Sequence, residues 1–106
     1  MRRVTIAVIL MVSLLFLTAS ARADDAAALY KSKCMGCHAA DGSGSPIGKK
    51  MGARDFRDLE VAKQTEQQIT DVISKGKNKM SAYAGKLTAD QIKELVSFIR
   101  DLQKKK

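Results

Sequence analysis

The pentapeptide Cys34-Met35-Gly36-Cys37-His38 constrains this chain more than any other feature of its sequence. Two thiols are separated by two residues, and an imidazole directly follows the second. This is the spacing of a covalent haem attachment site, in which each cysteine forms a thioether with a haem vinyl group and the histidine binds the iron. We therefore expect one haem c, attached through Cys34 and Cys37, with His38 as an axial iron ligand.

Other uses of such a cysteine pair fit the chain less well. A structural zinc site needs about four ligands, whereas both cysteines and the one histidine of the chain lie inside these five residues. A redox-active dithiol would follow a strand of a βαβ unit, and no segment shows that pattern. A disulfide between the two thiols would leave the adjacent histidine unexplained. The redox dithiol is the main alternative.

The motif resembles the attachment site of class I cytochromes c, in particular the small bacterial members with one haem. The resemblance implies an all-α fold, with three to four short helices wrapped around one covalently attached haem c. It also implies a carrier of single electrons rather than an enzyme.

The first 23 residues are predicted to be an export signal. Met1-Arg2-Arg3 is a positive start, Val4 to Leu17 is an apolar run, and Ala21-Arg22-Ala23 is a signal-peptidase site. The run of 14 residues is shorter than the roughly 20 that span a bilayer, so we expect cleavage after Ala23 rather than an uncleaved anchor. The mature cytochrome c domain would be residues 24–106, located in the periplasm, where such motifs receive haem.

The mature domain is small and basic. The chain has 19 basic and 11 acidic residues, and losing the three arginines of the first 23 residues leaves a net charge of about +5. A domain of this size usually needs an additional stabilising link, a staple such as a disulfide or a bound cofactor, besides its core. A covalently attached haem would serve as that staple, so we expect the chain without haem to be largely unfolded.

Three helices are predicted from caps and apolar periodicity. The first begins at Asp24 or Asp25 and runs into Cys34, with Ala26 and Tyr30 on the same face as that cysteine. Two more begin with capping boxes, Thr65 to Gln68 and Thr88 to Gln91. The second helix is expected to end at Gly76, and the third carries a stripe from Ile92 to Leu102, with Phe98 beside it facing the first helix.

The segment between the first two helices reads mainly as loop. Residues 39–52 are rich in glycine and serine. By resemblance to the family, the Pro46 carbonyl is the candidate acceptor for the free N–H of His38. Phe56 and Leu59 are expected to pack on the haem, and three basic residues are candidates for a haem propionate: Lys50, Arg54 and Arg57.

The sixth iron ligand separates a carrier from an open haem site. With one histidine in the chain, a methionine is the obvious donor. Met80 follows the second helix in a glycine- and lysine-rich segment that resembles the methionine-ligand loop of the family, so we expect Met80 to bind the iron. Met51 and an open site are the alternatives. Ser81 stands where the family usually has proline.

We therefore expect a periplasmic one-electron carrier of a respiratory chain, monomeric, that docks on acidic redox proteins through a lysine-rich haem edge. The alternatives are a peroxidase-like or ligand-binding haem protein with an open or labile sixth position, and a donor subunit of a membrane redox complex. We expect neither nucleic-acid binding nor membrane insertion after cleavage. The lysines expected at the edge are Lys75, Lys77, Lys79 and Lys86, with Lys31, Lys33, Lys49 and Lys50 as additions.

Overall fold

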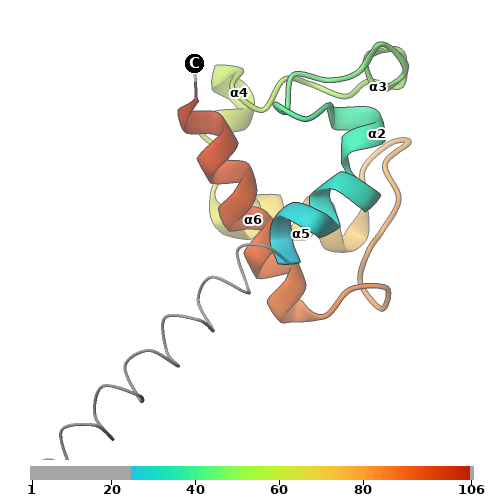
Figure 1. Ribbon diagram of the computed structural model, residues 1–106, viewed down its shortest axis with the longest axis vertical. Coiled ribbons are helices and arrows are strands. Elements are labelled where there is room, and N and C mark those ends of the chain that lie inside the picture. Colours follow the sequence, from blue (N-terminus) through green and yellow to red (C-terminus); the bar gives the residue numbers. More distant parts are fainter. Residues whose placement is uncertain (1–24, 106) are drawn as a thin grey trace, which may run out of the picture.

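The protein is described by a computed structural model that covers residues 25–105. Residues 25–33 are helical, and five further helices follow: α2 (Met35–His38), α3 (Pro46–Lys50), α4 (Leu59–Ala62), α5 (Glu66–Lys75) and α6 (Ala89–Lys104) (Figure 1). Within this range there is no strand, only the isolated bridges Lys77–Met80 and Ala84–Leu87. The all-α prediction is confirmed. The predicted export signal and the possible cap Asp24 lie outside the described residues.

The helices are more numerous than expected because three of them are only about one turn long. One of these corrects the prediction that residues 39–52 are loop: α3 occupies residues 46–50. The Ser45 hydroxyl accepts a hydrogen bond from the Gly48 N–H (3.0 Å), and Pro46 takes the first helical position, where its missing N–H costs nothing. A single turn of this kind has no apolar periodicity to reveal it.

The two longer helices begin where their sequences predict, and α5 also ends at the predicted residue. Thr65 caps α5 and Thr88 caps α6, and in both helices the side-chain oxygen of the third residue, a glutamine, accepts a hydrogen bond from the backbone N–H of the threonine. Gly76 ends α5 with φ of +76° and ψ of +169°, a conformation that favours glycine.

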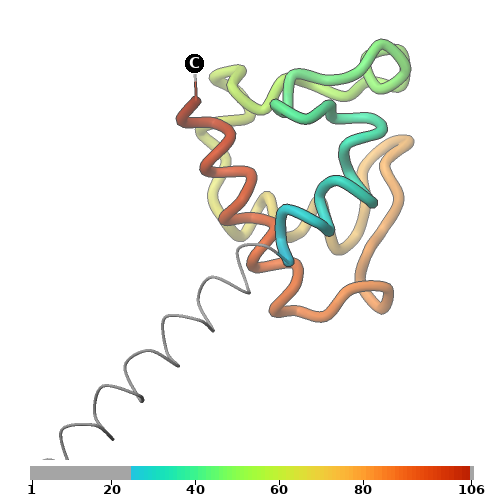
Figure 2. The backbone as a smooth tube through the Cα atoms, viewed as in Figure 1, coloured from blue at the N-terminus to red at the C-terminus, as the bar shows by residue number. Residues whose placement is uncertain are grey.

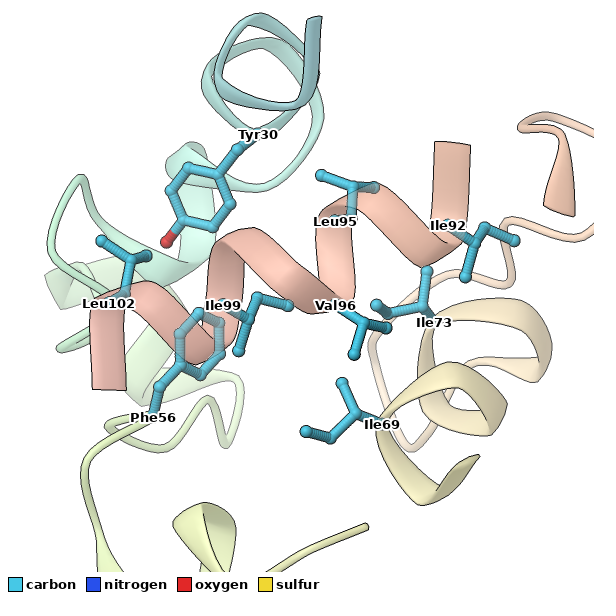
Figure 3. Close-up of a cluster of buried hydrophobic side chains, with 9 residues drawn as sticks. All are labelled: Tyr30, Phe56, Ile69, Ile73, Ile92, Leu95, Val96, Ile99 and Leu102. Carbon is cyan, nitrogen blue, oxygen red and sulfur yellow. The ribbon is translucent and has the colours of Figure 1, made fainter. Parts of the chain in front are cut away.

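The core lies between α6, α5 and the first helix, and α6 supplies five of its buried side chains (Figure 3). Leu95 of α6 is 1% exposed. Tyr30 is buried on the first helix, and its ring centroid lies 4.9 Å from that of Phe98, as expected for the crossing of these helices. The Tyr30 hydroxyl donates to the Ala39 carbonyl (2.6 Å), which satisfies the buried hydroxyl group.

The remaining segments are held around this core. The Arg100 side chain on α6 donates to the carbonyls of Ala62 (3.1 Å) and Gln64, and so fixes the end of α4. On the other side, the loop after α5 passes beside the first helix (Figure 2). Within residues 25–105, no helix is long and apolar enough to cross a membrane.

Candidate functional site

The attachment motif forms one continuous helical turn. The Cys34 N–H donates to the Tyr30 carbonyl (2.9 Å), and the His38 N–H donates to the Cys34 carbonyl (3.0 Å). Cys37 and His38 are therefore three and four residues beyond Cys34 on a helix, so the three side chains lie on one face. All three line the same cavity.

This cavity has a volume of about 400 Å³, within the range of cofactor and ligand sites. Its walls come from every major part of the fold. Apolar side chains of the core form much of the lining: Phe56, Ile69, Ile73, Leu95 and Ile99. A cavity of this size at the centre of so small a core would be costly to leave empty, which indicates that a large apolar group belongs there.

His38 lies half-buried on the cavity wall, with its ring centroid 4.7 Å from that of Phe56. Burial lowers the pKa of His38 and thereby favours the neutral imidazole, the form that binds metals. Its Nδ1 atom is buried and has no hydrogen-bond partner among the described residues. A buried ring nitrogen without a partner is unusual, so no hydrogen bond to this atom within the described residues fixes the orientation of the imidazole.

The Pro46 carbonyl does not supply the acceptor that was expected for His38, since Nδ1 is unpartnered within the described residues. The reason is that Pro46 begins α3, where a carbonyl points along the helix axis toward the N–H four residues later.

The turn that carries the motif is supported by Ser45 and Gly48, which the sequence analysis missed. The Ser45 hydroxyl donates to the Gly36 carbonyl (2.7 Å), and the Ser45 N–H donates to the Cys37 carbonyl (2.9 Å). Gly48 is buried directly against Cys37. A serine-proline pair followed by glycine could have indicated a capped turn at this place.

Cys34 and Cys37 form no disulfide bond among the described residues. Burial raises the pKa of the Cys34 thiol to about 11. The attacking thiol of a redox dithiol has a lowered pKa instead, so the environment of Cys34 argues against that alternative. Within residues 25–105, no group of three or more Cys, His, Asp or Glu side chains is placed to hold a metal ion.

Both candidate methionines line the cavity, but in different environments. Met80 is half-buried and packs against the core, whereas Met51 is 39% exposed. The Met80 N–H donates to the Lys77 carbonyl (2.9 Å), and the Met80 carbonyl accepts from the Lys77 N–H (3.3 Å), which closes a tight turn. The structure therefore brings Met80 to the same cavity as Cys34, Cys37 and His38.

The outcome differs among the residues expected around the haem. Phe56 is buried and lines the cavity. Leu59 is 77% exposed, so its expected packing on the haem is wrong: it begins the short helix α4, which turns this side chain to solvent. Arg57 donates two hydrogen bonds to the Asp55 carboxylate (3.0 and 3.1 Å), and Lys50 is exposed away from the cavity, which leaves Arg54 as the candidate that lines it.

The lysines expected at the haem edge differ in their surroundings. Lys33, Lys77 and Lys79 line the cavity. The Lys75 ammonium lies 4.0 Å from the Asp71 carboxylate, and the Lys86 ammonium lies 5.7 Å from the ring centroid of Tyr83. The other three expected lysines are exposed but do not line the cavity: Lys31, Lys49 and Lys50.

Comparisons with known proteins decide what class of protein this is. A family model described as cytochrome C oxidase, cbb3-type, subunit III matches residues 21–99. A solved structure of a c-type cytochrome, KustC0563, is 35% identical with a TM-score of 0.69, and the match covers 74% of this chain and 96% of that one. This chain belongs to the c-type cytochromes.

Two curated relatives of the cytochrome are similar over most of their length. They are the cytochromes c6 of Thermosynechococcus vestitus and of Thermostichus vulcanus, each 28% identical over 96 residues. Each match covers 91% of this chain and 84% of the relative. The cytochrome is thus a small class I member, a haem c protein of the electron-carrier type.

Proposed function

We propose that this cytochrome is a periplasmic one-electron carrier whose single haem c has histidine and methionine as axial ligands. Cys34 and Cys37 form the thioethers, and His38 and Met80 bind the iron. The observation that supports this most strongly is that these four side chains, from the attachment turn and from the loop after α5, line one cavity. We include in the proposal that the protein transfers electrons only and has no catalytic residues of its own.

The chemistry of the ligand pair suits a carrier. When bound, haem c supplies a one-electron couple between Fe(III) and Fe(II). The imidazole of His38 and the thioether of Met80 are both neutral, and the soft sulfur favours Fe(II), which raises the reduction potential relative to two histidines. The apolar walls disfavour the additional charge of Fe(III) in the same direction. With both ligands retained, a change of oxidation state requires little rearrangement.

The basic residues at the cavity suggest how the carrier meets its partners. Lys33, Lys77 and Lys79 are exposed and line the cavity, and we call these three residues the lysine rim. We include in the proposal that this rim docks on acidic patches of a reductase and an oxidase, because complementary charge speeds encounter and keeps it brief. Export is supported by the apolar run and the signal-peptidase site before Asp24.

The visible spectrum of the oxidised holoprotein tests the ligand assignment. Methionine-ligated ferric haem has a weak far-red charge-transfer band. We expect this band in the wild type and in Met51→Ala, and its loss in Met80→Ala. A high-spin ferric spectrum in the wild type would contradict the proposal and favour the alternative of an open sixth position.

A second candidate function shares this chemistry but not the diffusing role. The matched family model is named for a subunit of an oxidase, so the cytochrome could serve as the donor subunit of a membrane redox complex. Fractionation of cells separates the two: the carrier is released with the periplasmic contents, whereas a subunit stays with the membrane complex.

A further inference from the structure

Met80 lies in a segment whose backbone is hydrogen-bonded directly before this residue but not directly after it. Before Met80, the turn is closed by the paired hydrogen bonds with Lys77. After Met80, Ser81 and Ala82 are exposed, and neither forms a backbone hydrogen bond with another residue of the range 25–105. Tyr83 is therefore the first residue after Met80 at which the chain is anchored.

Tyr83 is anchored through both its backbone and its side chain. Its N–H donates to the Ile73 carbonyl on α5 (2.9 Å). Its hydroxyl donates to the Lys33 carbonyl (3.2 Å), across 50 residues of sequence, and its ring packs against the core. Lys33 directly precedes Cys34, so this one side chain connects the loop that carries Met80 to the helix that carries the first attachment cysteine.

We propose that Tyr83 is a positioning residue for Met80, and that its hydrogen bond to the Lys33 carbonyl keeps the thioether on the cavity wall. The inference rests on the proposed function, because it takes Met80 as the sixth ligand. Ser81 is the residue after Met80, so no proline ring restricts the backbone there. The hydrogen bonds of Tyr83 therefore limit how far Ser81 and Ala82 can move, and with them Met80.

Competition for the sixth position measures this role in the ferric holoprotein. Imidazole added in solution binds the iron only when Met80 leaves it. Tyr83→Phe keeps the ring and its packing but removes the donor. The loss of one hydrogen bond between neutral groups should make Met80 easier to displace. We therefore expect Tyr83→Phe to bind imidazole about two- to tenfold more tightly than the wild type does.

Tyr30→Phe is the matched control, since it also removes a tyrosine hydroxyl that donates to a backbone carbonyl, that of Ala39. This bond does not touch the Met80 loop. We expect Tyr30→Phe to lower the melting temperature but to change the imidazole affinity by less than about twofold. In Tyr83→Phe, and not in the control, amide hydrogen exchange is expected to become faster at Tyr83 and Ala84, whose N–H groups donate to carbonyls of α5.

The outcomes distinguish the two proposals. A wild-type ferric spectrum without the far-red band overturns the proposed methionine ligation and this inference with it. A wild-type spectrum with the band, together with equal imidazole affinities for wild type and Tyr83→Phe, overturns the positioning role alone. Equal increases in affinity in both tyrosine variants would likewise overturn it, because they would reflect a general loss of stability.

Discussion

Gly48 in α3 lies so close to Cys37 that a β-carbon on the glycine would overlap the Cys37 carbonyl oxygen. The same carbonyl accepts a hydrogen bond from the Ser45 N–H (2.9 Å), one residue before α3 begins. The backbone of α3 thus packs directly on the attachment turn and sets its place on the cavity wall.

Gly48→Ala is expected to displace α3 from the attachment turn. No backbone atom at this contact can yield by the required distance, so we expect a loss of about 3 kcal/mol or more in the free energy of unfolding. Denaturant unfolding of the holoprotein measures it. Gly36→Ala is the control within the motif: its β-carbon would have no neighbour within 4 Å. A Gly48→Ala variant as stable as Gly36→Ala would contradict the observed packing.

Gly76→Ala is expected to weaken the Met80 loop. Gly76 has φ of +76°, and a β-carbon there would lie 2.6 Å from the Met80 carbonyl oxygen. Gly85 has φ of +85° but no such neighbour, so Gly85→Ala should cost only the backbone strain, about 1–2 kcal/mol. We expect Gly76→Ala to cost more and, unlike Gly85→Ala, to reduce the far-red band. Equal behaviour of the two variants would show that the contact with Met80 is unimportant.

Removal of the haem is expected to unfold the domain. The cavity of about 400 Å³ lies against the side chains that make up the core, and the apoprotein would have to keep it open or collapse it. A double variant Cys34→Ala and Cys37→Ala, expressed without covalent haem, should lose most of its helical circular dichroism. A cooperative thermal transition in that apoprotein would contradict this expectation.

The lysines at the cavity are expected to control reaction with anions. Lys77→Glu combined with Lys79→Glu reverses the charge at the rim. Oxidation of the reduced holoprotein by ferricyanide should become slower by about two- to tenfold at low ionic strength, with the difference vanishing at high salt. Lys93→Glu combined with Lys105→Glu makes the same change in net charge away from this cavity. An equal effect of both double variants would point to net charge alone.

Asp55 is expected to contribute to stability at neutral pH and to lose that contribution in acid. The two hydrogen bonds from Arg57 hold the pKa of the Asp55 carboxyl below its usual value. A depressed folded-state pKa stabilises the fold above the unfolded pKa of about 4, and the effect disappears as pH falls through the folded value. The melting temperature should therefore fall less in Arg57→Gln than in wild type when the pH is lowered from 7 to 2. Parallel pH profiles would contradict this role.

Much of this protein could be predicted from local patterns. Cys34, Cys37 and His38 occur within five residues, so their spacing alone indicates haem attachment and requires no knowledge of the fold. The capping boxes at Thr65 and Thr88 are equally local, because each hydrogen-bonded pair spans three residues. The starts of α5 and α6 and the attachment chemistry were accordingly accessible from the sequence, whereas the single-turn helix α3 was not.

Contacts between distant segments could not be predicted in this way. The packing of Gly48 on Cys37, the bond from Tyr83 to Lys33 and the exposure of Leu59 each depend on how separate segments meet. Neither periodicity nor composition predicts these contacts, because they form only when the whole core is buried together. The sequence therefore identifies which groups can hold the haem, whereas the three-dimensional packing determines how Met80 and His38 are brought to one cavity and what keeps them there.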